Sequence, residues 1–133
     1  MTERLLIVLA LAAIVLAVAL LLRARARRAA SALVGQPVPE PLRARLGASP
    51  AIVYFYGPHC GSCIQQAREL DALEPACRIV RLDATREPAL ADALRVATVP
   101  ATAVVDRAGR LRALNLGYRP GRDLGEQLAL AIG

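Results

Sequence analysis

The sequence has few of the residue types that most metal and nucleic-acid sites require. Its 133 residues include one histidine, three cysteines, three tyrosines, one phenylalanine and no tryptophan. A zinc site with the usual four ligands would have to use all the histidine and cysteine residues at once or recruit carboxylates. Aromatic residues are 3% of the chain, which leaves few side chains on which unpaired bases could stack.

Lysine is also missing, and the arginines are unevenly distributed. The 17 basic residues oppose 11 acidic ones, for a net charge of +6. Residues 1–39 hold five arginines and one glutamate (+4), whereas residues 40–133 hold twelve arginines and ten acidic residues (+2). Residues 40–133 therefore lack the dense basic surface of a nucleic-acid-binding domain, and we expect no nucleic-acid partner.

One long apolar segment stands near the start of the chain. Residues 5–22 are 18 apolar residues without a charge, glycine or proline. As a helix they would extend about 27 Å, enough for the hydrocarbon core of a bilayer. The segment is longer than the apolar part of a typical secretory signal, and four arginines separate it from the small residues Ala30-Ser31-Ala32. It predicts an uncleaved single-pass anchor in a cell membrane; a cleaved signal is the alternative.

The arginines on either side of this segment predict its orientation. Arg23, Arg25, Arg27 and Arg28 follow the apolar residues, and only Arg4 precedes them. Positive residues favour the cytoplasmic side of a membrane. The rest of the chain is therefore predicted to lie in the cytoplasm, with the extracytoplasmic side as the alternative.

Beyond the anchor, the residue pattern predicts a connector and one α/β domain. After a short tail (1–4) and the anchor (5–22) comes an arginine-rich and then proline-rich connector (23–47), followed by a domain at 48–133. Strands are expected at 51–56, 78–83, 102–105 and 111–116, and helices at 42–46, 61–74, after residue 88 and after residue 121. From residue 51 the order β-α-β-α-β-β-α predicts a central mixed β-sheet flanked by helices on both faces.

Helical spacing also predicts which side of the helix at 61–74 faces the core. Ile64, Ala67, Leu70 and Leu73 recur at three-residue intervals and are expected to form its inner face. Tyr54 and Tyr56 of the first strand, and Cys77 before the second, are also expected in the core.

Two cysteines stand where the first predicted strand gives way to its helix. In Cys60-Gly61-Ser62-Cys63, the first cysteine lies at the N-terminus of that helix. Free amides and the helix dipole stabilise a thiolate there and lower its pKa. Because the thiolate is the nucleophile of disulfide exchange, this position prepares Cys60 for attack. Cys63, one turn later, is expected to be more buried and close enough to resolve a mixed disulfide.

The neighbours of Cys60 are candidate tuning residues. Gly61 allows a partner chain to approach closely, and Ser62 can offer a weak hydrogen bond to sulfur. A protonated His59 would place a positive charge beside Cys60. Alternatively, His59 only covers the rim of the site.

Zinc binding is the other common use of two cysteines at this spacing. The further candidate ligands would be Cys77 and His59. However, His59 is adjacent to Cys60, and Cys77 lies beyond a helix. This ligand set fits a metal poorly, so we expect no metal and no organic cofactor.

A proline directly precedes the third predicted strand, in the dipeptide Val99-Pro100. Proline cannot donate a hydrogen bond to a sheet, so it is unusual at an internal strand. Either a cis peptide bond or an ordinary trans proline at the strand start accounts for it.

The chain resembles the thioredoxin superfamily over residues 48–133. The resemblance lies in the order of its parts: a strand, a CxxC helix, a second strand and helix, a Val-Pro, a β-hairpin and a last helix. The resemblance implies a thioredoxin-like fold in which Cys60 attacks and Cys63 resolves, through a redox disulfide Cys60–Cys63. It also implies that Pro100 is cis and packs against the disulfide, with the Val99 backbone pairing with an extended partner. The function implied is a membrane-tethered thiol-disulfide oxidoreductase acting on protein disulfides or thiols, with a second protein resetting the pair.

The chain also departs from the family pattern. Thioredoxins usually have Trp where this chain has His59, Pro where it has Ser62, and many bury Asp where it has Tyr54. The N-terminal strand and helix of full thioredoxins are shortened or missing. These departures leave an alternative function, a binding module without turnover for a membrane partner or a soft metal ion.

Overall fold

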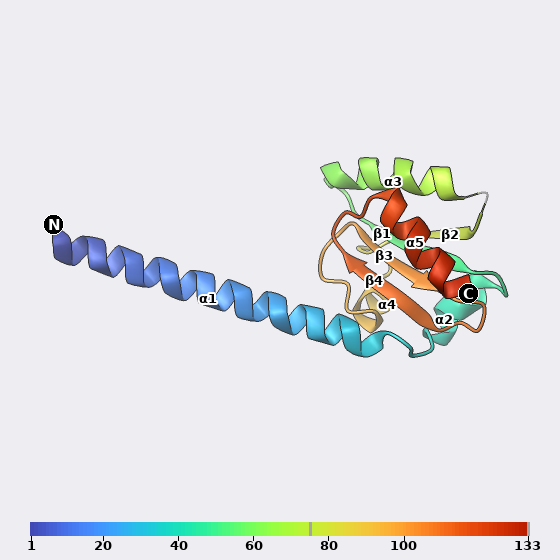
Figure 1. Cartoon of the computed structure of the whole chain (residues 1–133), viewed down its shortest axis with the longest axis horizontal. Coiled ribbons are helices and arrows are strands. Elements are labelled where there is room, and N and C mark those ends of the chain that lie inside the picture. The colour runs from blue at the N-terminus through green and yellow to red at the C-terminus, as the bar shows by residue number, and fades with distance from the viewer. Residues whose placement is uncertain (75, 133) are drawn as a thin grey trace. The chain divides into compact units, whose positions relative to one another are not determined.

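The structure, a computed structural model, describes residues 1–74 and 76–132. The chain separates into two compact units, Met1–Ala32 and Leu33–Gly133. After Met1, the first unit is formed entirely by helix α1 (Thr2–Leu33). The second unit contains the remaining helices and all the described strands (Figure 1).

Helix α1 is the candidate membrane span. Its leucine, isoleucine and valine side chains between Leu5 and Leu22 are exposed, and among the described residues it is the one helix long and apolar enough to cross a bilayer. The helix does not end with the apolar residues but continues for eleven more, from Arg23 to Leu33. Arginine and alanine, which dominate this extension, are strong helix formers. The first part of the predicted connector is therefore helical.

A four-stranded mixed sheet forms the centre of the second unit, and the predicted fold class is confirmed. The strands are β1 (Ala51–Tyr56), β2 (Arg78–Asp83), β3 (Ala101–Val105) and β4 (Leu111–Leu116). Their spatial order is β2-β1-β3-β4, with β2 parallel to β1 and the other neighbouring pairs antiparallel. All four predicted strands are present, and only β3 begins a residue earlier than expected.

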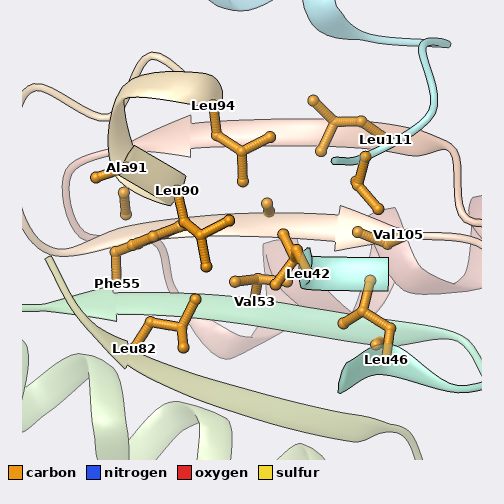
Figure 2. Close-up of a cluster of buried hydrophobic side chains, with 14 residues drawn as sticks. Leu42, Leu46, Val53, Phe55, Leu82, Leu90, Ala91, Leu94, Val105 and Leu111 are labelled. Carbon is orange, nitrogen blue, oxygen red and sulfur yellow. The ribbon is translucent and has the colours of Figure 1, made fainter. Parts of the chain in front are cut away.

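Strand β1 is buried on both faces, because its alternate residues enter two separate apolar clusters. Val53 and Phe55 point into the first cluster, beneath α2 (Glu40–Leu46) and α4 (Pro88–Ala93) (Figure 2). Leu42 and Leu46, both fully buried, attach α2 to this cluster, which accounts for the helix predicted at 42–46.

Ile52 and Tyr54 point to the opposite face of the sheet, into the second cluster. Helices α3 (Gly61–Leu73) and α5 (Gly121–Ile132) cover it, with Leu70 and Leu124 fully buried between them and the sheet. The helices therefore form a layer on each face of the sheet.

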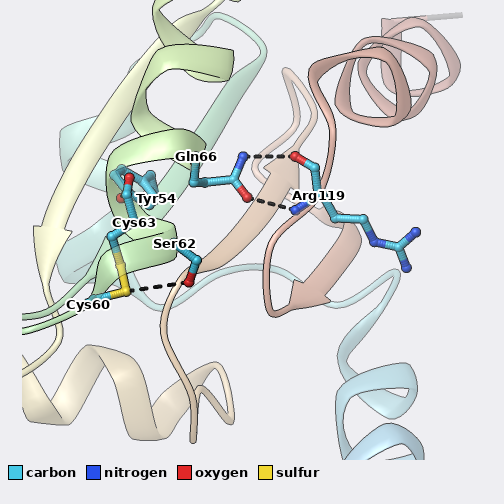
Figure 3. Close-up of a disulfide and its surroundings, with 6 residues drawn as sticks. All are labelled: Tyr54, Cys60, Ser62, Cys63, Gln66 and Arg119. Carbon is cyan, nitrogen blue, oxygen red and sulfur yellow. Dashed lines mark hydrogen bonds between the residues drawn. A yellow bond between two sulfur atoms is a disulfide. The ribbon is translucent and has the colours of Figure 1, made fainter.

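The predicted inner face of α3 is wrong at its first residue. Ile64 is 63% exposed, whereas Gln66, a polar residue, is fully buried. Gln66 can be buried because its amide pairs with the backbone of Arg119: Nε2 donates to the carbonyl oxygen (3.0 Å) and Oε1 accepts from the N–H (2.8 Å) (Figure 3). A buried amide with both ends paired avoids the desolvation cost that normally excludes glutamine from cores.

A second contact connects α3 with the start of α5. Glu69 Oε2 accepts a hydrogen bond from the Gly121 N–H (2.8 Å), and Oε1 accepts one from the Tyr118 hydroxyl (3.2 Å). A Cβ at position 121 would lie 2.5 Å from the Glu69 carboxylate, so any larger residue there would displace this side chain from its hydrogen bond. Gln66 and Glu69 together fix the segment 118–121 against the helix that carries the cysteines.

Replacing Gln66 by alanine is expected to lower the free energy of unfolding by about 1–3 kcal/mol, because Gln66→Ala removes both partners of the Arg119 backbone and leaves a void. The exposed neighbour Gln65 provides a matched control, and Gln65→Ala should change stability by less than about 0.5 kcal/mol. Urea unfolding of the full chain in detergent measures both. Equal effects of the two substitutions would contradict a structural role for the Gln66 amide.

Candidate redox site

The cysteine pair is positioned by the sharp turn from β1 into α3. His59 adopts a positive φ of 58°, in the left-handed region where histidine is among the more frequent non-glycine residues. Cys60 then returns to an extended conformation as the N-cap residue of α3, and Gly61 begins the helix. The first-turn N–H groups of an α-helix have no partner within it and carry partial positive charge. Cys60 therefore lies where a thiolate is stabilised.

Cys60 and Cys63 form a disulfide across the first turn of α3 (Figure 3). Cys60 is partly exposed, whereas Cys63 is only 6% exposed. Ser62 Oγ lies 3.9 Å from Cys60 Sγ, within range of a weak hydrogen bond to sulfur. The space beside Gly61 is open, since a Cβ there would have no atom within 4 Å. The outer sulfur is therefore the one that a partner can reach.

Tyr54 lies beneath the disulfide, on the side of the sheet. Its hydroxyl donates a 2.8 Å hydrogen bond to the Cys63 carbonyl oxygen, and the residue is 3% exposed. Burial raises the pKa of Tyr54, an effect that the nearby Arg81 guanidinium opposes. The phenol is thus neutral at neutral pH, and Cys63 has a neutral donor below it instead of a carboxylate. The sequence placed Tyr54 correctly in the core but gave no indication of this hydrogen bond.

The Val99-Pro100 dipeptide reaches the same region from another part of the chain. The peptide bond between the two residues is cis. Val99 packs against the apolar cluster that contains Cys63, and its side chain lies against Gly57, where a Cβ would be 3.2 Å from Val99 Cγ2. Pro100 is buried, and its carbonyl oxygen accepts a hydrogen bond from the Gly117 N–H (2.8 Å).

The remaining candidate ligands do not gather around the pair. His59 is exposed at the rim. Cys77 is a buried free thiol whose Sγ is 3.7 Å from the Leu73 carbonyl oxygen, at the far end of α3. Within residues 1–74 and 76–132, no three His, Cys, Asp or Glu side chains are grouped so as to hold a metal ion.

Comparisons with known proteins identify the family. The thioredoxin family model matches residues 42–129, which is most of the chain, so the chain belongs to the thioredoxin family. None of the curated proteins matches it closely enough to count as a relative.

Solved structures share the fold at low sequence identity. Chloroplastic thioredoxin z is 24% identical, with a TM-score of 0.61, over 74% of this chain and 93% of its own. Thioredoxin from Fasciola hepatica is 20% identical, with a TM-score of 0.60, over 70% and 90%. A malarial protein is 18% identical, with a TM-score of 0.59, over 64% and 99%. A thioredoxin domain with a disulfide-forming Cys60–Cys63 pair supports a thiol-disulfide redox function.

After reduction, Cys77 is expected to react with iodoacetamide about tenfold or more slowly than Cys60 at pH 7. Burial, and then the charge of Glu74, raise the pKa of the Cys77 thiol, so less of it is thiolate, the form that reacts. Raising the pH to 9 should narrow the difference between the two rates, because the thiolate fraction of the buried Cys77 increases with pH. Mass spectrometry of the alkylated chain measures both rates, with urea-unfolded chain as the control. Equal rates in the folded chain would show that Cys77 is accessible.

Proposed function

We infer that the protein is a membrane-tethered thiol-disulfide oxidoreductase in which Cys60 attacks and Cys63 resolves a mixed disulfide with a partner protein. The observation that carries this function is the disulfide itself, which joins a partly exposed sulfur at a helix N-terminus to a buried one. In this arrangement one sulfur is available to a partner and the other is shielded, which a two-step exchange requires.

The exchange starts from the reduced pair. The Cys60 thiolate attacks one sulfur of a partner disulfide, which forms a Cys60–partner disulfide and releases the other partner sulfur as a thiolate. Cys63 loses its proton and attacks Cys60 Sγ, which forms the Cys60–Cys63 disulfide and releases the second partner thiolate. Two electrons pass from the dithiol to the partner, and the released thiolates take up protons. The same steps reversed oxidise a partner dithiol.

The protein's own residues assist at defined atoms. The α3 N–H groups stabilise the Cys60 thiolate, and the Ser62 hydroxyl, 3.9 Å from Cys60 Sγ, can donate to it. Tyr54 holds the Cys63 carbonyl, which fixes the first turn of α3. Val99, next to the cis Pro100, presents backbone groups to an extended partner. A second protein with a dithiol or disulfide must reset the pair after each cycle.

The apolar helix α1 supports a tether. Its exposed side chains from Leu5 to Leu22 suit the interior of a bilayer, and the arginines after them suit anionic headgroups. A tether restricts partners to proteins at or near the membrane and raises their effective concentration. The excess of arginine after the span favours a cytoplasmic redox domain, because positive residues favour that side of a membrane.

Replacing Cys63 by serine should trap partners covalently. In Cys63→Ser the first attack by Cys60 still occurs, but no thiol is left to displace the partner. Expression of the full chain with this change should give adducts that are lost on treatment with dithiothreitol, seen as bands on non-reducing gels. Cys63→Ser combined with Cys60→Ser, and Cys77→Ser alone, are the matched controls and should give none. If partners are retained non-covalently by every variant and no adduct forms, the binding-module function replaces exchange.

The topology predicts that reduced Cys60 is protected from a membrane-impermeant maleimide in intact cells and reacts after permeabilisation. The control is a chain without its native cysteines and with Thr2→Cys, which places a thiol at the opposite end of α1 and should react in intact cells. Mass shifts of the purified chain measure both. Rapid labelling of Cys60 in intact cells would place the domain outside the cytoplasm.

A further inference from the structure

A groove of about 660 Å³ opens beside the disulfide on the face of the sheet that carries α3. Cys60 and Cys63 are among the residues that line it. Its volume lies within the range of about 300–1,000 Å³ typical of ligand pockets. Of the described residues that line it, none belongs to the Val99-Pro100 segment, whose Val99 side chain lies against the lining residue Gly57. The groove is therefore not formed by the backbone with which the family resemblance pairs a partner.

The floor of the groove comes from two neighbouring parallel strands. Tyr54 of β1 pairs in register with Arg81 of β2, so both side chains point to the α3 face. Tyr56 is two residues after Tyr54 and points the same way, with the two rings 5.8 Å apart. Of the described elements, α3 and α5 cover this face over the middle of the sheet, while β2 lies at its edge. The groove lies where α3 borders the side chains of Tyr54, Tyr56 and Arg81.

One wall is the side of α3 that carries Ile64 and Ala67. Ile64 immediately follows Cys63 and is 63% exposed. Tyr56, on the floor, is 36% exposed. Exposed large apolar side chains beside a reactive sulfur leave apolar surface in water, and burying it against a partner is favourable.

Among the described residues that line the groove, the one arginine, Arg81, is already engaged. Arg81 reaches from β2 to α3 and pairs with Asp71 (2.6 Å) and Glu74 (3.3 Å). An acidic ligand would therefore compete with two carboxylates for a single guanidinium. Glutathione, which has two carboxylates and little apolar surface, suits this lining poorly.

We propose that this groove binds an apolar side chain of the partner protein, next to the cysteine that forms the mixed disulfide with Cys60. The proposal rests on the proposed function, since Cys60, which lines the groove, must join the partner's sulfur. A side chain one or two residues from that sulfur then lies over Tyr56 and against Ile64. The groove makes Ile64 and Tyr56 specificity-determining residues that select partners with apolar residues beside the reactive cysteine.

The test uses the reduced full chain in detergent and short peptides whose single cysteine is joined to thionitrobenzoate. Attack by Cys60 on the peptide sulfur forms the Cys60–peptide disulfide and releases one coloured thionitrobenzoate, which gives the rate constant. We expect a peptide with leucine on both sides of the cysteine to react about tenfold faster than one with aspartate there, because the leucine side chain is partly buried in the groove.

The readout is the leucine-to-aspartate rate ratio within each variant. Ile64→Ser should reduce this ratio at least threefold, whereas Leu130→Ser, at an 81% exposed leucine on α5, should leave it unchanged. A wild-type ratio near one, or a ratio that survives Ile64→Ser, overturns the proposal. Faster reaction with glutathione disulfide than with the leucine peptide also overturns it, as does a dimer that Ile64→Ser dissociates, which would assign the groove to a second copy.

Hydroxyethyl disulfide is too small to use the groove, so its reduction tests the oxidoreductase function independently of the groove proposal. If the wild-type chain reduces hydroxyethyl disulfide but does not distinguish the peptides, only the groove proposal fails. If it reduces neither, the oxidoreductase function fails as well.

Discussion

The burial of β1 on both faces is the constraint on which the rest of the domain depends. Val53 and Phe55 belong to one apolar cluster, and Ile52 belongs to the cluster on the opposite face. All three side chains are fully buried. The strand is also hydrogen-bonded on both edges, to β2 and β3. Because packing and hydrogen bonding fix β1, they also fix the point where the turn at His59 leads into α3. The packing of β1 therefore determines the location of Cys60, at the start of that helix.

Helix α3 uses its different sides for different tasks. One side is attached through Gln66 and Glu69 to the segment before α5, the N-terminus presents the disulfide, and the side with Ile64 borders the groove. Because the first attachment is made by paired polar groups, it specifies one orientation more sharply than apolar packing alone. Because both stand on the same helix, the distance between the two sulfurs and the Ile64 side of the groove is fixed.

The features that depend on local sequence were predictable, and those that depend on distant partners were not. The strands, the fold class and the placement of the cysteine pair followed from hydrophobic pattern and from the order of motifs. Helical spacing predicts which residues share a side of α3, but not the rotation of the helix on the sheet. That rotation is set partly by the pairing of Gln66 with Arg119, which is 53 residues away. The spacing therefore placed Ile64 inside, and nothing local indicated that Gln66 is buried.

The groove illustrates the same limit. Tyr56 was expected in the core because β1 is apolar throughout, and the structure shows it at the surface. Whether the end of a strand is covered depends on the neighbouring elements, and here the helices on the α3 face leave Tyr56, the last residue of β1, 36% exposed. An exposed tyrosine and an exposed isoleucine are therefore consequences of topology, which pattern analysis of single segments does not contain.

The open edge of β2 also bears on how copies of the chain behave when crowded. Backbone groups along an unpaired strand can pair with another molecule, and confinement to a two-dimensional surface would bring such edges together often. Three of the six residues of β2 are charged: Arg78, Arg81 and Asp83. Charged side chains on an edge oppose the close, dry approach that strand-to-strand aggregation needs. The arginines of β2 thus help to keep an exposed sheet soluble and its edge unoccupied.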